Sequence, residues 1–423
     1  MKLVQCIRNA ATQQTKVCNF EVDSMTNVPK SILSKTKVGL HNLPASPLCI
    51  LKEKIINWFD KCESGIYRQV SHQSPIVSIK ENFDDLLIPK DHISRSASDT
   101  YYVNSKHVLR THTSAHQSSL LASKSAIGYL VTADVYRRDE IDATHYPVFH
   151  QMEGIRLFSR NLDDIKVAKV KLEKNIVGNS NINVTETELS GNNMYQSTHS
   201  SLEQDLVTIH LKKHLEGLFG HLFQRKDEKP LQMRWIQAYF PFTQPSWELE
   251  VEYRGKWLEV CGCGVIQQRI LDKSGNSDKI GWAFGLGLER IAMVLFDIPD
   301  IRLFWSKDER FVSQFQPNKI SKFVPFSKYP ACYKDVSFWC DPKFHDNDFF
   351  QMVRDVAEDF GAQDLVESVS LIDTFVHPKT LKMSKCFRIQ YRSFERTLSN
   401  EEVDELHKGI QKMVTNLWNV EIR

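Results

Sequence analysis

Apolar residues recur along this chain with two different spacings, which predict helices in some segments and strands in others. Between residues 48 and 59 they lie three or four positions apart, as in an amphipathic helix. Residues 126–137 are rich in valine and tyrosine without a helical period, and residues 146–153 form a second extended run. The polar residues 139–145 between these runs predict a strand–loop–strand hairpin.

The middle of the chain continues the alternation. A helical spacing returns over residues 202–222, and residues 235–268 predict several strands. Residues 281–284 lead through a glycine turn into a helix over residues 289–296. The Asn-, Ser- and Thr-rich residues 173–200 predict a polar surface loop.

The last hundred residues predict a separate small domain. Ser399 caps its second helix and Glu402 completes a capping box, while Gly361 closes the first helix. The resulting order β-α-β-β-α-β is that of a ferredoxin-like sandwich. The predicted elements are strand 331–339, helix 348–360, strands 365–376 and 386–394, the helix after Ser399 and a final strand 420–422.

Composition and charge narrow the function classes. The formal charge is +2, so any nucleic-acid contact must come from local patches. No apolar run approaches the ~18–20 residues of a membrane span. The nine cysteines show no C-x-x-C pair, which argues for a reducing compartment and against a zinc ribbon. Cys261 and Cys263 are therefore expected to be buried thiols, and no zinc site is expected.

Two arginines on separate elements carry the first chemical signal. Arg137 ends the predicted hairpin, and Arg290 closes the run Gly285-Leu286-Gly287-Leu288-Glu289-Arg290. That run lacks the third glycine of a dinucleotide fingerprint and the G-K-[ST] of a phosphate-binding loop. Two planar, permanently charged guanidinium groups can clamp the phosphates of one bent ATP. This layout resembles that of class II aminoacyl-tRNA synthetases.

Several short runs accompany the arginines and make the match more specific. They cover residues 110–117, 134–139, 145–147, 149–153, 239–243, 257–260, 262–264 and 281–285. In combination they resemble the phenylalanyl-tRNA synthetases, and the resemblance extends from about residue 40 to the C-terminus. It implies an α+β fold, in which a class II catalytic domain with an antiparallel sheet flanked by helices precedes a ferredoxin-like anticodon-binding domain.

The resemblance also implies roles for aromatic residues. Phe240 and Phe242 would contact the phenyl ring of the substrate, with Ala283 and Phe284 as the floor of its pocket. Phe149 would stack on adenine. Aromatic pairs of this kind contribute ~0.5–1.5 kcal/mol beyond burial. Core packing is the alternative interpretation of Phe240 and Phe242.

The polar site residues implied by the resemblance hold the charged ends of the substrates. Arg137 and Arg290 are the expected catalytic residues, with His145 near the pyrophosphate. Glu259 is the expected contact for Mg²⁺, which prefers oxygen ligands. The other expected substrate-binding residues are Ser114, Ala115, His116, Gln117, Thr144, Tyr146, Gln151, Met152 and Glu153.

The predicted small domain carries a concentration of basic residues. Arg388 and Arg392 alternate with apolar residues in a predicted strand, so they are expected to face away from the core. Together with Lys385 they form the expected contact with tRNA phosphates. A solvated sheet face is the alternative interpretation.

The expected domain organisation follows from these elements. Residues 1–36 are basic at their start and carry no acid before Glu21, which is typical of a transit peptide or a disordered tail. The catalytic domain is expected over residues 37–305, a linker over 306–327 and the anticodon-binding domain over 328–423. Catalytic motifs and this module on one short chain resemble the mitochondrial, monomeric form of the family.

The expected partners are therefore phenylalanine, ATP, Mg²⁺ and tRNA(Phe), in the mitochondrial matrix and without a membrane. Two alternatives stay open at this point. One is a class II synthetase for another amino acid, against which Phe240, Phe242 and Ala283 argue. The other is a catalytically idle RNA-binding protein on a synthetase scaffold, against which the intact Arg137 and Arg290 argue.

Overall fold

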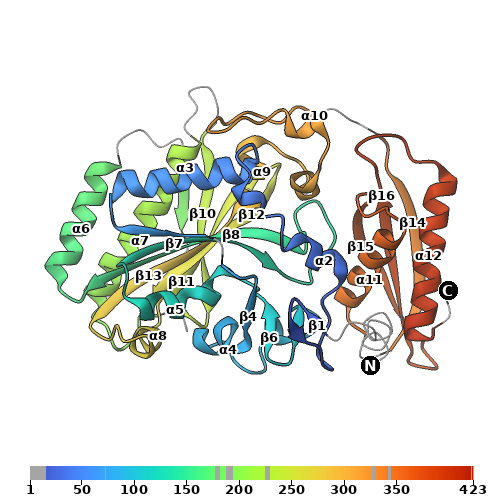
Figure 1. The fold of residues 1–423 in the computed structure, drawn as a ribbon, viewed down its shortest axis with the longest axis horizontal. Helices are drawn as coiled ribbons and strands as arrows, with labels where there is room; N and C mark the ends of the chain where they lie inside the picture. The colour runs from blue at the N-terminus through green and yellow to red at the C-terminus, as the bar shows by residue number, and fades with distance from the viewer. Residues whose placement is uncertain are drawn as a thin grey trace.

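Two domains lie side by side, and each is built on its own β-sheet (Figure 1). The larger domain holds a sheet of eight strands, and the smaller domain holds a sheet of three. The computed structural model describes residues 16–71, 73–176, 182–186, 194–223, 229–325, 329–341, 344–420 and 422. Within these ranges no helix combines the length and the apolar character that crossing a membrane requires.

The large sheet is antiparallel in its centre and parallel at its two edges. The strand order is β3 (Tyr67–Val70), β7 (Gly128–Tyr136), β8 (Val148–Ser159), β13 (Lys279–Gly287), β12 (Lys256–Ile266), β11 (Thr243–Tyr253), β10 (Leu231–Phe240) and β9 (Ile182–Glu186). Strands β3 and β9 run parallel to their neighbours β7 and β10. The prediction of an antiparallel sheet is therefore right for the central strands and wrong at the edges.

The predicted hairpin is present as β7 and β8, which pair antiparallel from Gly128–Arg156 to Tyr136–Val148. Every residue of β7 is buried, which explains why its sequence shows no polar alternation. The run expected as a glycine turn is instead the end of β13. Helix α9 (Leu288–Phe296) begins directly after Gly287.

Different elements cover the two faces of the large sheet. Helices α3 (Pro47–Cys62), α7 (Ser201–Leu222) and α9 share one core with sheet residues such as Trp282 and Phe284, and α6 (Leu162–Asn175) packs on α7. On the opposite face, α5 (Gln117–Ser123) and α8 (Gln268–Lys273) share a second core with Ala283. In Figure 1, α3 lies above the sheet while α4 (Ile79–Asn82), α5 and α8 lie below it.

A small three-stranded sheet, β4 (Ile76–Ser78), β6 (His107–Leu109) and β5 (Tyr102–Asn104), completes the lower face. The N-terminal segment packs beside it. Residues 16–36 form β1 (Lys16–Val17), β2 (Phe20–Glu21) and α2 (Lys30–Lys35), and Val17, Val28 and Ile32 are buried. The expectation of a tail is therefore wrong for these residues, because the apolar side chains that dock them are isolated and show no period. Residues 1–15 lie outside the described ranges.

Two other segments are more ordered than the sequence indicated. The expected polar loop 173–200 includes the end of α6 and the edge strand β9, although residues 177–181 and 187–193 lie outside the described ranges. The expected linker includes α10 (Glu309–Val312), and Phe311, Phe315 and Phe323 are buried in the core of the large domain. Residues 306–325 therefore belong to the packed large domain.

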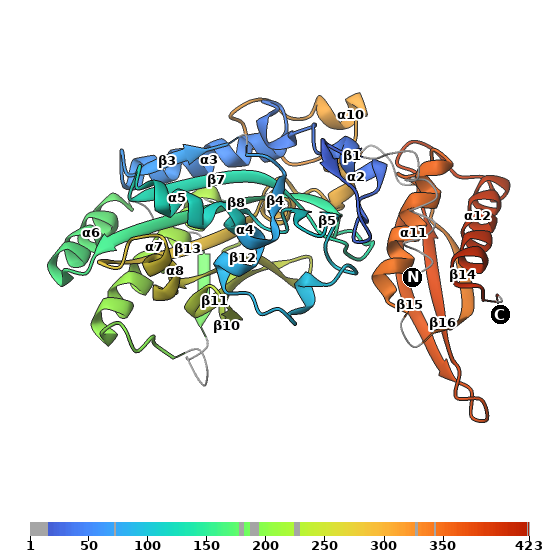
Figure 2. The ribbon, with the colours of Figure 1, turned by 60° about the horizontal axis from the view of Figure 1, so that its bottom comes forward.

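The small domain has the predicted order of elements. Its sheet order is β14 (Cys332–Cys340), β16 (Met383–Tyr391) and β15 (Val366–Val376), with helices α11 (Asp346–Asp359) and α12 (Asn400–Trp418). Ser399 and Glu402 form the predicted capping box, and Gly361 has the predicted positive φ of 63°. Ile422 bridges to Phe338 of β14. Helix α11 and strand β15 lie beside the large domain, whereas α12 lies farther out (Figures 1 and 2).

Candidate active site

Strand alternation decides which residues of the hairpin reach the candidate site. Phe149, Gln151 and Glu153 occupy alternate positions of β8 and share one face of the sheet. His150 and Met152 occupy the positions between them, and Met152 is buried in the core beneath α3, α7 and α9. The assignment of Met152 to the substrate site is therefore corrected, because its side chain lies on the other face.

Glycines make an open floor on the face of the sheet that carries Phe149, Gln151 and Glu153, which we call the site face. Glu153 pairs across the sheet with Gly285, Gly285 with Gly262, and Gly262 with Glu248. A Cβ built on Gly285 would meet no atom within 4 Å, whereas one on Gly262 would lie 2.9 Å from the ring of Phe240. The floor is thus free at Gly285 and covered by an aromatic ring at Gly262.

The predicted aromatic residues divide between the two faces. The rings of Phe240 and Phe242 stack with their centroids 5.7 Å apart. Ala283 lies in the core that Phe242 contacts, on the site face. Phe284 points to the other face, where its centroid lies 5.4 Å from that of Phe59 on α3. Phe284 is therefore corrected from a pocket-floor residue to a core residue.

A buried acid lies beside the run that starts α5. Ser114, Ala115 and His116 belong to the short 3-10 helix Thr113–His116, and Gln117 is the first residue of α5. The Glu153 carboxyl lies next to the Thr113 and Ser114 hydroxyl groups, and burial raises the pKa of Glu153 to about 8. Within the described part of the chain, neither Glu153 nor the buried Gln117 amide has a well-formed hydrogen bond. Buried polar groups without partners are typical of sites that bind a polar ligand.

His116 has a different environment from the one expected. Its Nε2 accepts a hydrogen bond of 2.9 Å from Arg110, whose guanidinium group also pairs with Asp134 at 2.5 Å. Burial and the Arg110 charge lower the pKa of His116 to about 4, so the ring is neutral. The imidazole thus holds the buried Arg110–Asp134 pair in place.

His112, which the sequence analysis did not select, lies closer to the aromatic pair. Its ring stacks on Phe242 with centroids 6.1 Å apart, and burial lowers its pKa to about 3. Both ring nitrogens are buried without a hydrogen-bond partner among the described residues. Its position inside the run 110–117 was the available signal, but that run contains two histidines and sequence alone does not separate them.

The two predicted arginines line one pocket. The Arg137 Nε donates to the Thr111 carbonyl at 2.9 Å, and its guanidinium carbon lies 5.2 Å from the centre of the Phe149 ring. Arg290 comes from α9, on the far side of the same pocket. The other lining residues are Asp139, Thr144, His145, Tyr146, Gln151, Glu259, Val260, Gly285, Gly287, Glu289 and Ile301.

His145 links Arg290 to the hairpin loop. The Arg290 Nη2 lies 3.1 Å from His145 Nε2, and His145 Nδ1 lies 2.8 Å from Asp142. Because arginine only donates, Nε2 accepts and Nδ1 carries the proton that is donated to Asp142. The hydrogen bond to Asp142 raises the pKa of His145, which the neighbouring Arg290 charge opposes. Asp142, which the sequence analysis did not select, therefore sets the orientation of His145.

Carboxylates near Arg290 could hold a divalent cation. Glu259 lies 3.4 Å from Arg290 Nη1, and burial together with the charges of Glu259 and Glu250 raises the pKa of Glu248. A cation between Glu248 and Glu259 would relieve this repulsion, and carboxylate oxygens are ligands that Mg²⁺ accepts. The donor set thus fits the expected magnesium and adds Glu248 to it.

Another set of potential ligands, Glu63, His210 and His214, is buried behind the site. Glu63 already accepts hydrogen bonds from Tyr67 at 2.6 Å and from Arg156 at 3.2 Å. Trp282 Nε1 donates to Nδ1 of His210, so the second nitrogen of that neutral ring carries the proton. These contacts use the groups that would bind a metal, and the set is better explained as a buried hydrogen-bond network.

Comparisons with known proteins agree with this geometry. Residues 39–190 and 190–315 match the family described as tRNA synthetases class II core domain (F), and residues 327–423 match the Ferredoxin-fold anticodon binding domain. The chain is 48% identical to the chloroplastic/mitochondrial phenylalanine–tRNA ligase of Arabidopsis thaliana, over 95% of this chain and 84% of the relative. The chain belongs to the phenylalanine–tRNA ligases. Its fold is thus the predicted class II core followed by the predicted anticodon-binding domain.

Two further relatives match this ligase over most of their own length. The mitochondrial phenylalanine–tRNA ligase of Mus musculus is 45% identical over 96% of this chain and 87% of its own. That of Saccharomyces cerevisiae is 42% identical over 94% of this chain and 92% of its own. The predicted family and enzyme class are thereby confirmed, while the roles of individual site residues stay predictions.

The predicted tRNA-binding residues of this ligase do not share one face. Arg388 points away from the helices of the small domain. Lys385 lies two residues before the buried Phe387, so the two share the opposite face of the strand, and Lys385 pairs with Asp346 at 2.5 Å. Arg388 forms an ion pair with Asp335 at 2.8 Å, and Arg392 forms one with Glu367 at 3.1 Å. Two of the three predicted cations therefore lie on the outer face, and each is already paired with an acid.

Proposed function

We propose that this phenylalanine–tRNA ligase forms phenylalanyl-adenylate on the glycine floor of the large sheet. Adenine stacks on Phe149, and Arg137 and Arg290 bind the phosphates. The phenyl ring enters beside Phe240, Phe242 and Ala283. The observation that carries this proposal is the convergence of Arg137, Phe149 and Arg290 in one pocket.

The proposed chemistry needs no general base in its first step. The phenylalanine carboxylate attacks the α-phosphorus, a new O–P bond forms, and the bond to pyrophosphate breaks. Catalysis then consists of positioning the reactants and stabilising negative charge by Arg137 and Arg290. Glu259 and Glu248 would hold Mg²⁺, which supplies further charge neutralisation. In the second step a terminal ribose hydroxyl of tRNA, the 2′-hydroxyl by family resemblance, attacks the carbonyl carbon and AMP leaves.

Substrate selection is proposed to depend on Glu153 and the aromatic residues. A carboxylate at Glu153 would pair with the substrate ammonium group, which supports a zwitterionic amino acid as the ligand. Phe240 and Phe242 stack in parallel and favour an aromatic side chain. An apolar pocket lowers kcat/KM for a substrate with an added hydroxyl group by a factor of only ~10², so weak use of tyrosine is expected.

The small domain is proposed to bind tRNA(Phe) through the outer face of its sheet. Arg388 and Arg392 lie on this face, and Tyr333 beside them is exposed. Phosphates would have to compete with Asp335 and Glu367 for these arginines, so each contributes less than an unpaired cation. The proposed setting is the mitochondrial matrix, where the ligase acts as a monomer.

The deciding test is ATP–pyrophosphate exchange with all twenty amino acids, in wild type and in Arg290→Ala. We expect exchange with phenylalanine, a much weaker signal with tyrosine, and a loss of at least about 100-fold in the variant. Circular dichroism checks that the variant is folded. Exchange with another amino acid would overturn the proposed specificity, and wild-type exchange by folded Arg290→Ala would overturn the proposed phosphate clamp.

A further inference from the structure

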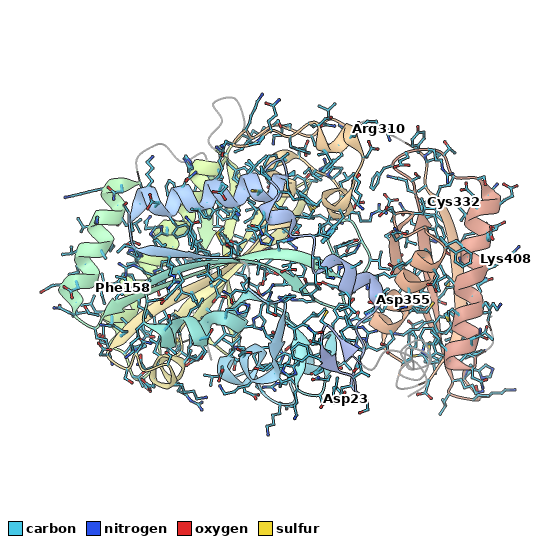
Figure 3. All side chains as sticks on the ribbon, viewed as in Figure 1. Asp23, Phe158, Arg310, Cys332, Asp355 and Lys408 are labelled. Carbon is cyan, nitrogen blue, oxygen red and sulfur yellow. The ribbon has the colours of Figure 1, made fainter. Side chains whose placement is uncertain are left out.

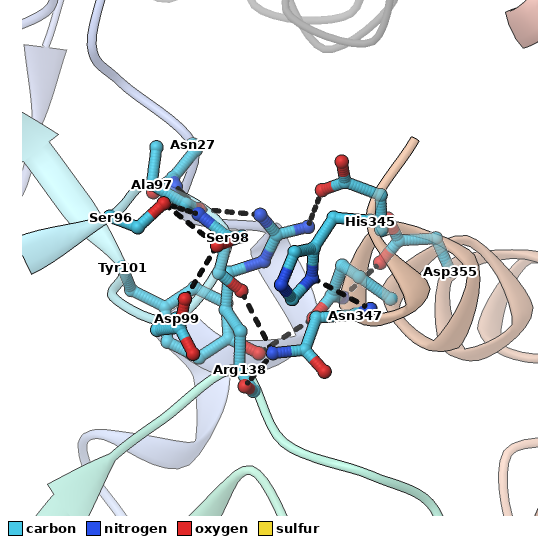
Figure 4. Close-up of polar contacts among 12 residues, drawn as sticks. Asn27, Ser96, Ala97, Ser98, Asp99, Tyr101, Arg138, His345, Asn347 and Asp355 are labelled. Carbon is cyan, nitrogen blue, oxygen red and sulfur yellow. Dashed lines mark hydrogen bonds and ion pairs between the residues drawn. The ribbon is translucent and has the colours of Figure 1, made fainter. Parts of the chain in front are cut away.

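The hairpin loop that connects β7 and β8 is bound by the small domain. Arg138 forms an ion pair of 3.0 Å with Asp348 on α11, and its carbonyl accepts a hydrogen bond of 3.0 Å from the Asn347 amide. The Arg138 guanidinium also donates to the Ala97 carbonyl at 2.6 Å, within the large domain. Figure 4 shows this network, in which Arg138 lies between Ala97 and the start of α11.

The next residues of the loop are held in the same way. Arg354 of α11 donates through Nη2 to the carbonyl groups of Asp139 and Glu140, the latter at 2.7 Å. Ile141 forms a β-bridge with Val369 of β15, whose N–H donates to the Ile141 carbonyl at 2.9 Å. Surface loops normally leave such carbonyls to water. Here the backbone from residue 138 to residue 141 is bound by a different domain.

This loop joins the groups that face the phosphate pocket. Arg137 immediately precedes the bound residues 138–141, and Asp142, which orients His145, immediately follows them. Asp139 itself lines the pocket. A shift of the loop backbone would therefore move Arg137 and His145 relative to Arg290. Displacements of about 1 Å in a positioning group can lower a rate by ~10².

We propose that Arg354, a residue of the small domain, is a positioning residue for amino-acid activation. By binding the Asp139 and Glu140 carbonyls, it holds the hairpin loop in the shape that places Arg137 and His145 against ATP. Activation in the absence of tRNA then depends on a residue of the domain that is named for the anticodon. This inference rests on the proposed roles of Arg137 and His145.

The guanidinium group is well suited to this task. Arg354 is partly buried at the junction between the domains, and a single Nη2 reaches two successive carbonyls. A methionine has a similar length but cannot donate, whereas a lysine keeps the charge and three N–H donors on a shorter reach. Comparing the two replacements separates the loss of hydrogen bonds from a change in side-chain volume.

The test measures ATP–pyrophosphate exchange by Arg354→Met and Arg354→Lys in the full-length chain without tRNA. We expect Arg354→Met to raise the KM for ATP or lower kcat by about 10- to 100-fold while the KM for phenylalanine changes less than about threefold. Arg354→Lys is expected to recover part of this loss. Arg396→Met is the matched control, because Arg396 pairs with the exposed Glu402 in the same domain and is expected to leave exchange unchanged.

The outcomes distinguish this inference from the proposed function. Wild-type KM for ATP and wild-type kcat in folded Arg354→Met would overturn the positioning role while leaving the ligase activity intact. Equal losses for ATP and phenylalanine, accompanied by a lowered Tm, would also overturn it, because they indicate general loosening of the fold. Absence of exchange in the wild type would instead overturn the proposed function.

Discussion

Glu153 shows how a single residue can link substrate binding to pH. Its carboxyl group is buried on the site face and lacks a cationic partner among the described residues. Burial disfavours the charged form, so at neutral pH the group is mostly protonated before the substrate binds. A substrate ammonium group would supply the missing charge and favour release of this proton.

The binding of phenylalanine is therefore expected to tighten as pH rises. With a pKa of about 8 for free Glu153, the fraction of carboxylate grows between pH 6 and pH 8. The KM for phenylalanine should fall by up to about tenfold per pH unit over this range and level off above it. Kinetics of exchange across this range measure the effect. Glu153→Gln should bind more weakly at pH 8 and lose the slope, and the same slope in both proteins would contradict the assignment.

At the scale of single elements, strand alternation explains which predictions succeed. The sequence runs on β8 and β13 identified the right strands, but each run names neighbours that point to opposite faces. Gln151 lines the pocket while Met152 enters the core, and Ala283 lies on the same face of the sheet as the pocket while Phe284 lies on the other. Resemblance alone does not separate such neighbours until the sheet register is known.

Gly154 of β8 lies directly opposite Phe284 of β13. A Cβ on Gly154 would lie 2.2 Å from that ring, so Gly154→Ala must displace it. We expect a loss of about 1–3 kcal/mol in the free energy of unfolding, measured by urea denaturation. Adding Phe284→Leu to the Gly154→Ala variant should restore part of the lost free energy of unfolding.

Gly285 provides a matched control for Gly154, since a Cβ there would meet no atom within 4 Å. Gly285→Ala should keep nearly wild-type stability while it fills the open floor of the site. A destabilisation of Gly285→Ala as large as that of Gly154→Ala would contradict the expected difference between the two glycines.

The spacing of apolar residues predicted the long, regular elements. It failed for segments that are held by only a few separate buried side chains. Helix α7 and the helices of the small domain were predicted because their apolar residues repeat, and the hairpin was predicted because its valine- and tyrosine-rich runs lack a helical period. Residues 16–36 and 306–325 were not, because a few separate side chains such as Ile32 and Phe315 dock them. Short segments of this kind carry no periodic signal, and only the assembled surface shows where they fit.

At the scale of the whole molecule, the junction between the domains contains a partly buried acid. Asp355 lies where α11 faces the large domain (Figures 3 and 4). Its carboxylate accepts a hydrogen bond of 2.8 Å from Gln351, whose side-chain carbonyl accepts one from Tyr101 of the large domain. Burial raises the pKa of Asp355 to about 6, although the charges of Arg138 and Arg354 oppose this shift.

This raised pKa makes stability depend on pH in a defined direction. The folded protein holds the Asp355 proton more tightly than the unfolded chain, so the contribution of this group to stability falls as pH rises from about 4 to about 6. Asp355→Asn should therefore match the wild type near pH 4 and exceed it by up to about 3 kcal/mol above pH 6. Urea denaturation at several pH values measures this difference, and a difference that stays constant with pH would show that the Asp355 proton is not its cause.

The docked N-terminal segment limits how this ligase can mature. Asn27 donates hydrogen bonds to the carbonyl groups of Ala97 and Thr100, and Ala97 is also the acceptor for Arg138 at the domain junction (Figure 4). A protease that removed all 36 residues of the predicted leader would expose the core around Tyr101 and weaken the support of the hairpin loop. A cleavage site compatible with this fold must therefore lie before Lys16, where the first strand of the docked segment begins.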